Sequence, residues 1–173
     1  MVAPVAIWSF AAPVNAFTLL PTEVPVHHLR IAYAGLVTAL TLGSGMAAQP
    51  FARRLEARHS RLVARVGLGL TTVGLVVAAL TVASGMPVLN VAVAVLLGSA
   101  YGFVLTYSLG EAARIAAPGE LARLTAIVYA LVYAGMFTPL VITALTVLVP
   151  MTALLGAGAA LAALCLTWIW IRV

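Results

Sequence analysis

Four long runs without a charged residue constrain this chain more than any other feature. Residues 1–22, 31–52, 66–110 and 124–171 contain no Asp, Glu, Lys or Arg, and these runs are 22, 22, 45 and 48 residues long. A helix needs about 20 apolar residues to cross the ~30 Å hydrocarbon core of a bilayer. The first two runs therefore hold one span each, and we expect each of the two longer runs to fold back once.

Each long run has a helix breaker near its middle, Gly85-Met86-Pro87 in one and Val149-Pro150 in the other. The apolar runs are continuous and lack the alternation of a membrane β-barrel. The pattern predicts an all-α integral membrane protein, a single domain over residues 1–173. Its six transmembrane helices are expected at about Ala3–Leu20, Leu29–Gln49, Val63–Ala83, Val88–Gly110, Leu121–Val147 and Pro150–Ile171.

Composition excludes several other classes of protein. Of the 173 residues 64% are apolar and 8% are charged, so a water-facing surface cannot be covered with charge. Nine arginines are spread along the chain, and no single solvated face could collect them to bind nucleic acid. Cys165 is the only cysteine, which leaves no internal disulfide and no thiolate zinc site. We expect no cofactor or metal; His27 and His28, four and five residues after Glu23, are interpreted as part of a polar loop.

The arginines predict the orientation. Eight of the nine fall on one side of the predicted topology, and Arg30 alone falls on the other. Such a bias marks the cytoplasmic side. Both termini are therefore expected in the cytoplasm, and the protein in the cell (inner) membrane. The eight are Arg53, Arg54, Arg58, Arg61, Arg65, Arg114, Arg123 and Arg172.

The segment after the second predicted helix carries the first resemblance to a known family. It reads Gly45-Met46-Ala47-Ala48-Gln49-Pro50-Phe51-Ala52-Arg53-Arg54. It resembles the signature loop of the major facilitator superfamily, which has a glycine, an acid four residues later, and a basic pair after another small residue. Gln49 stands in the place of the acid, and Ala52 replaces the second glycine. The resemblance implies a cytoplasmic gate, for which Gly45, Gln49, Arg53, Arg54, Glu111 and Arg114 are the candidates.

The second resemblance is in the fourth and fifth predicted helices. Gly110-Glu111-Ala112-Ala113-Arg114, followed by Tyr129 through Tyr133 to Pro139, looks like the C-terminal six-helix half of prokaryotic members. This implies secondary transport of a small solute by alternating access. Family members normally have twelve helices, so a second six-helix half is expected: a copy of this chain, a separate subunit, or a missing N-terminal half.

Polar and aromatic residues inside the predicted helices are the candidates for lining a solute cavity, because polar groups in hydrocarbon are costly. An alternative role for each is structural: an amide can join helices, a hydroxyl can bond its own helix, and an aromatic pair can pack. Tyr129 and Tyr133, four apart, are expected to share a helix face. The candidates are Asn15, Thr38, Thr41, Ser99, Tyr101, Tyr129 and Tyr133.

Other patterns favour packing over chemistry. Gly98, Gly102 and Gly110 recur at multiples of four with Thr106 between, which predicts close approach of another helix. Gly156 and Ala160 suggest the same for the last helix. Pro4, Pro13 and Pro139 predict kinks. Glu111 with Arg114, and Glu120 with Arg123, are three apart and could pair within a turn, or Glu111 could bond Arg53 and Arg54 when the gate closes.

Three classes of function follow from these residues. The leading hypothesis is a transporter half that moves a small organic, uncharged or amphipathic solute. The sequence leaves the direction of transport open, and export is one of the two possibilities. The second is an accessory or scaffold subunit, or a non-functional transporter fragment, without its own solute path. The third, an intramembrane enzyme, lacks the paired acids, Ser–His pair or metal cluster that it would need, and we expect no enzyme.

Overall fold

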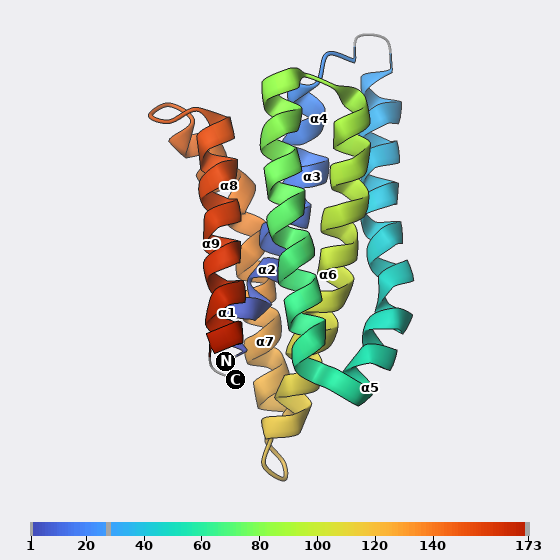
Figure 1. Ribbon diagram of the computed structural model, residues 1–173, viewed down its shortest axis with the longest axis vertical. Coiled ribbons are helices and arrows are strands. Elements are labelled where there is room, and N and C mark those ends of the chain that lie inside the picture. Colours follow the sequence, from blue (N-terminus) through green and yellow to red (C-terminus); the bar gives the residue numbers. More distant parts are fainter. Residues whose placement is uncertain (1, 27–28, 172–173) are drawn as a thin grey trace.

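The computed structural model describes residues 2–26 and 29–171, and this part of the chain contains helices and no β-strand. The predicted all-α class is confirmed. The longer helices run along the long axis of the molecule (Figure 1). In chain order the elements are α1 (Ala3–Ala6), α2 (Trp8–Ala11), α3 (Pro13–Thr18), α4 (Leu20–Glu23), α5 (Arg30–Ser84), α6 (Pro87–Ile115), α7 (Leu121–Ala134), the 3₁₀-helix η1 (Gly135–Phe137), α8 (Thr138–Leu145) and α9 (Met151–Ile171).

Five helical segments among the described residues are long and apolar enough to cross a membrane. The sequence predicts six spans, and the difference lies in α5, which contains both the second and the third. The two predicted breaks, at Gly85-Met86-Pro87 and Val149-Pro150, are confirmed, because α5 ends at Ser84 and α9 begins at Met151. The five segments are Ala3–Glu23, Arg30–Ser84, Pro87–Ile115, Leu121–Leu145 and Met151–Ile171.

The long helix α5 has 55 residues where the sequence predicts two helices joined by a loop. A break does lie within the predicted loop, residues 50–62, at His59 (φ −148°, ψ 78°), but the residues on either side of it are helical, so the prediction of a loop over the whole segment is wrong. Pro50 removes only one helical hydrogen bond, and the alanine, leucine, arginine and glutamate that follow are strong helix formers. The ribbon of α5 turns back on itself, so its two arms run in opposite directions (Figure 1), and the kink between them is at His59. We call residues 53–65 the kink segment.

The N-terminal segment Ala3–Glu23 runs through the interior of the bundle and contacts α5, α6, α7 and α8. It is four short helices rather than the single predicted one. Pro4, Pro13 and Pro21 each stand in the first two positions of a new helix. Proline has no N–H to donate, and the first residues of a helix are the place where this N–H is not needed. Small side chains such as Ala6 and Ala16 are completely buried and let the neighbouring helices approach.

The predicted fifth helix is also interrupted. α7 passes through the single turn η1 into α8, in which Pro139 is the second residue. The sequence predicts a kink at this proline, and the structure has its interruption directly before it. α8 ends at Leu145, two residues short of the predicted end.

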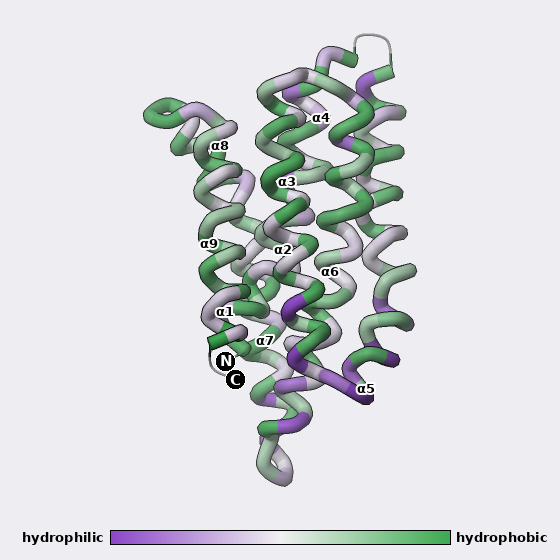
Figure 2. Tube along the Cα trace, viewed as in Figure 1, coloured by the Kyte–Doolittle hydropathy of each residue, from purple (hydrophilic) through white to green (hydrophobic). Residues whose placement is uncertain are grey.

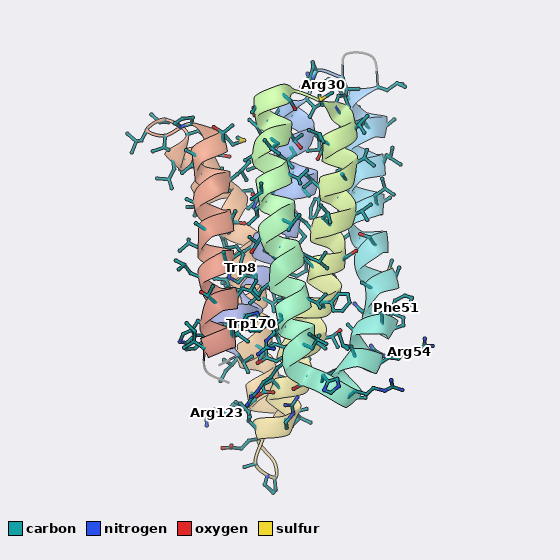
Figure 3. All side chains as sticks on the ribbon, viewed as in Figure 1. Trp8, Arg30, Phe51, Arg54, Arg123 and Trp170 are labelled. Atoms are coloured by element: carbon teal, nitrogen blue, oxygen red, sulfur yellow. The ribbon has the colours of Figure 1, made fainter. Side chains whose placement is uncertain are left out.

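Charge is concentrated at one end of the molecule. The most hydrophilic residues gather at the kink segment of α5 and at the adjoining ends of α6 and α7 (Figure 2). Arg54 and Arg123 lie at this end, whereas Arg30 lies at the opposite one (Figure 3). These arginines are therefore separated in space, at opposite ends of the molecule, as the predicted topology separates them along the sequence.

Glycines let α6 lie directly on the backbone of α5. Gly98 sits against the carbonyl oxygen of Thr41, and Gly102 against the carbonyl oxygen of Gly45; at either place a Cβ atom would overlap the neighbouring backbone. Gly67, on the second arm of α5, also packs closely on α6. Both arms of α5 are thus held on a single helix.

The predicted ridge of small residues on the fourth helix is confirmed. Gly110, one turn beyond Thr106, continues the contact and lies against the carboxylate of Glu56. The corresponding expectation for the last helix is wrong: Gly156 has nothing within 4 Å of an added Cβ, and Ala160 is exposed. Gly158 instead is the glycine of α9 that packs on α5, with Leu75.

These contacts predict opposite effects of one substitution at two glycines. In Gly98→Ala, the new Cβ would lie 2.9 Å from the carbonyl carbon of Thr41, which we expect to lower the free energy of unfolding by about 1–3 kcal/mol. Gly156→Ala meets open space and should raise it by up to about 1 kcal/mol through helix propensity. Unfolding in detergent micelles measures both. Equal effects would contradict the assigned α5–α6 contact.

Candidate functional site

A row of four aromatic rings joins three helices. The Tyr101 ring on α6 stacks on Phe10 of α2 at 5.1 Å between centroids, Phe10 stacks on Tyr133 of α7 at 5.9 Å, and Tyr133 stacks on Tyr129 at 6.2 Å. The predicted shared face of Tyr129 and Tyr133 is confirmed. Both tyrosines remain accessible, with exposed fractions of 39% and 54%. We call these four residues the aromatic row.

Phe10 is not among the residues that the sequence predicts to line a cavity. One aromatic residue in an apolar helix carries no local signal of its partners. Only the packing of α2 between α6 and α7 brings its ring between two tyrosines. Stacked pairs of this kind contribute about 0.5–1.5 kcal/mol each beyond the burial of their area.

The predicted hydroxyl candidates do not join the aromatic row through hydrogen bonds. Thr38 donates to the carbonyl oxygen of Ala34, and Thr41 donates to that of Val37. Thr41 is buried where α5 meets Gly98. Ser99 is half-buried on α6. The two threonine hydroxyls therefore make the intrahelical hydrogen bonds that the structural alternative requires.

Asn15 lies apart from the aromatic row. Its Nδ2 donates to the carbonyl oxygen of Ala11 at 2.6 Å and to Oγ1 of Thr138 at 3.2 Å, which ties α3 to α8. The residue is 2% exposed and lines a cleft with Trp8 and Thr138 rather than with the tyrosines. Thr138 is a partner that the sequence analysis did not anticipate, because it lies 123 residues away.

The candidate gate residues separate into a buried and an exposed part. Gly45 is buried beneath Tyr101 and Gly98 and is a contact between helices. Gln49 is half-buried one turn later, and Arg53 and Arg54 are exposed. All four lie on the first arm of α5, and Arg53 and Arg54 are the first two residues of the kink segment.

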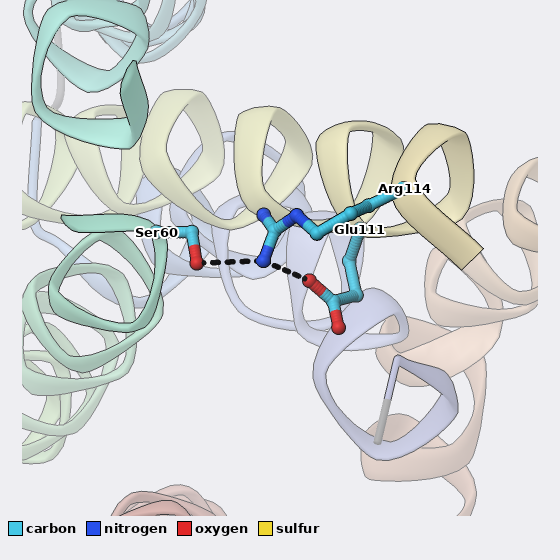
Figure 4. A network of polar contacts seen from close by, with 3 residues as sticks. All are labelled: Ser60, Glu111 and Arg114. Carbon is cyan, nitrogen blue, oxygen red and sulfur yellow. Dashed lines mark hydrogen bonds and ion pairs between the residues drawn. The ribbon is translucent and has the colours of Figure 1, made fainter. Parts of the chain in front are cut away.

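Glu111 and Arg114 form the ion pair that their spacing predicts. Arg114 Nη1 lies 2.9 Å from Glu111 Oε2 and donates to Ser60 Oγ, also at 2.9 Å (Figure 4). The ion pair of Glu111 is thus with Arg114 and not with Arg53 or Arg54. Arg114 links the end of α6 to the kink segment. Glu120 and Arg123, also described and three apart, form no ion pair.

Glu56 is a second acidic group at this end that the sequence analysis overlooked. Its carboxylate packs on Gly110 and is half-buried. Burial raises its pKa above the ordinary value of 4.5; Arg114 lowers the pKa, Glu111 raises it and Arg53 lowers it. Its contact with Gly110 could not be read from sequence because it depends on how the kink turns α5.

The kink segment also forms a basic hollow of about 550 Å³. Its lining includes Arg58, His59, Ser60, Arg61 and Arg65. The guanidinium of Arg65 lies 4.1 Å from the ring centroid of Trp170 on α9, a cation–π contact. This contact joins the kink segment to the last helix. His27 and His28, and Arg172 of the charge bias, lie outside the described residues.

Comparison of the chain with models of protein families, with curated proteins and with solved structures finds no match.

The position of Glu56 predicts a pH dependence of stability. A raised pKa means that the folded protein holds this proton more tightly than the unfolded chain, so stability should fall as pH rises above 4.5 through the folded-state pKa. Glu56→Gln removes the titrating group and should flatten this fall. Unfolding temperatures measured from pH 4.5 to neutral test it. Glu120→Gln, at an exposed position, is the control and should keep the wild-type slope; a wild-type slope in Glu56→Gln would refute the assignment.

Proposed function

We propose that this chain is one half of a secondary transporter of the major facilitator type, which moves a small organic solute by alternating access with a second six-helix half. The aromatic row is the observation that carries the proposal. It supplies an accessible wall of stacked rings to which three helices contribute. An aromatic, uncharged or amphipathic solute is the kind that such a wall would bind.

A membrane location is supported by the apolar exterior. Most residues of α7 are exposed, and few residues of α9 are buried, although both helices are rich in leucine, valine and alanine. In water such a surface would drive association, whereas in lipid it is the expected exterior.

Six spans follow if α5 counts as two. As a straight helix its 55 residues would be roughly 80 Å long, far more than the ~30 Å hydrocarbon core. The kink at His59 divides it into two arms, and the kink segment between them carries five arginines. A charged segment of this kind suits the cytoplasmic surface, which would place both termini in the cytoplasm of an inner-membrane protein.

Cysteine labelling tests this topology. Cys165 is the only cysteine, so Cys165→Ser gives a background into which single cysteines are placed. We expect Arg58→Cys and Arg123→Cys to be protected from a membrane-impermeant maleimide in intact cells, and Ser84→Cys, which is exposed at the opposite end, to be labelled. Labelling of position 58 together with position 84 would exclude the proposed spans.

The requirement for a second half is tested by the mass of the complex after gentle extraction from its native membrane. A complex that contains two copies of the chain, or this chain with another six-helix protein, supports the proposal. A monomer of 17.8 kDa contradicts it.

The aromatic row predicts a selective loss of transport. In proteoliposomes that hold the intact complex, Tyr133→Ala should slow the transport of Nile red, an uncharged aromatic probe, by about fivefold to tenfold, because stacking contributes about 1 kcal/mol. Tyr133→Phe keeps the ring and should retain transport. Phe137→Ala removes a ring of comparable exposure outside the row and is the matched control. Wild-type transport by Tyr133→Ala, or loss of assembly instead of transport, would favour an accessory subunit.

A further inference from the structure

The basic hollow of the kink segment carries positive charge and has no acidic group in its lining. Its volume is about 550 Å³. Most of its side chains are exposed, so the hollow opens to the outside of the molecule. The lining residues are three arginines, a histidine, a serine and a leucine: Arg58, His59, Ser60, Arg61, Leu62 and Arg65.

The acidic residues at this end of the molecule do not neutralise the three arginines. Glu111 pairs with Arg114, and this is the one ion pair among residues 2–26 and 29–171. The carboxylate of Glu56 lies against Gly110, and the cations with which its charge interacts are Arg114 and Arg53. Each arginine of the hollow therefore keeps its positive charge without a carboxylate partner.

Trp170 places the hollow at the level of a bilayer surface. Its ring lies 4.1 Å from the Arg65 guanidinium, is 60% exposed, and stands one residue before the end of α9. Tryptophan is typical of the boundary between hydrocarbon and headgroups, and an arginine beside it can extend its charge to the headgroup level.

An exposed apolar strip on α9 adjoins the hollow. Leu164 and Ile171 are seven residues apart and Leu161 is three before Leu164, so the three share one helix face, and all are exposed. The strip ends beside Trp170, whose ring contacts Arg65. A basic hollow and an apolar strip that meet at one end of a helix match the two parts of a phospholipid.

We propose that the hollow binds the phosphate headgroup of an anionic phospholipid whose acyl chains lie along the exposed strip of α9. A guanidinium can donate two parallel hydrogen bonds to phosphate oxygens. Ser60 accepts a hydrogen bond from Arg114, and its hydroxyl can also donate one. The inference rests on the membrane location proposed above and does not depend on transport.

The lining selects a headgroup with net negative charge. A choline or ethanolamine group would bring a further cation to three arginines and would find no carboxylate in the described lining. The bilayer is also the favoured source of the anion. A headgroup is held at the level of the hollow by its own chains, which raises its effective concentration there, whereas a free anion has no such anchor.

Trp170 reports which lipid lies beside the hollow. In the variant Trp8→Phe/Trp168→Phe, the parent for this experiment, it is the only tryptophan, since the chain has three. The intact complex is reconstituted into bilayers of equal parts phosphatidylglycerol and phosphatidylcholine, and one lipid or the other carries quenching bromines near the carboxyl ends of its chains. We expect phosphatidylglycerol to bind about fivefold to thirtyfold more tightly, as one or two arginine contacts allow.

Variants separate the hollow from the general charge of this end of the molecule. Arg61→Gln should lower the preference for phosphatidylglycerol about threefold to fivefold, and Arg58→Gln/Arg61→Gln should abolish it. Arg123→Gln is the matched control, because Arg123 is exposed at the same end but outside the hollow. It should keep the parent preference. An equal loss in Arg123→Gln and Arg61→Gln would overturn the proposal in favour of a diffuse positive surface.

Inorganic phosphate distinguishes a lipid site from a site for a soluble anion. At matched ionic strength it should reduce the preference no more than sodium chloride does, and selective displacement by phosphate would overturn the lipid assignment. Equal quenching by the two brominated lipids in the parent would overturn it as well, and neither result depends on a variant of the hollow. A parent that does not float with the vesicles would instead overturn the membrane location and the proposed function with it.

Discussion

The backbone contact between α5 and α6 is the constraint on which the rest of the structure depends. Gly98 and Gly102 bring α6 within carbonyl contact of the first arm, and Gly67 repeats this on the second. In an apolar surrounding helices gain little from burying apolar area against each other, so close packing of small residues has to supply the association. Once α6 is fixed to both arms, the kink at His59, the burial of Glu56 on Gly110 and the bridge from Arg114 to Ser60 follow from the same geometry.

Periodicity and charge predicted the helical class and the ends of most helices, because these depend on local chemistry. Breaks at Gly85 and Pro150 and pairings one turn apart, such as Glu111 with Arg114 or Tyr129 with Tyr133, are set by neighbours in sequence. The segment after Pro50 was misjudged for a physical reason. A proline costs a helix one hydrogen bond and a local clash, and a run of helix formers on its C-terminal side can outweigh this. The actual break falls nine residues later, at His59.

The site was less predictable because its contacts join distant segments. Phe10, Ser60 and Thr138 had no distinguishing pattern; each acquires its role from a helix that lies elsewhere in the chain. Ridges of glycine reveal that two helices meet, but not the register in which they meet. For the same reason Gly156 looked like a contact residue and is exposed, while Gly158 two positions later makes the contact. The side of a helix that is covered depends on the whole bundle.

The polar residues inside the helices also differ in what one helix can do for them. A threonine or serine has one hydrogen to donate, and the carbonyl four residues before can receive it, as happens at Thr41, Thr71 and Ser108. Such a residue needs no partner outside its own helix and is weak evidence of function. An asparagine has two donors and an acceptor, and the preceding turn offers only carbonyl oxygens. Asn15 therefore satisfies its donors at Ala11 and Thr138 and keeps an acceptor that no turn of helix could satisfy. An amide inside an apolar helix therefore depends on groups outside its own helix for part of its hydrogen bonding.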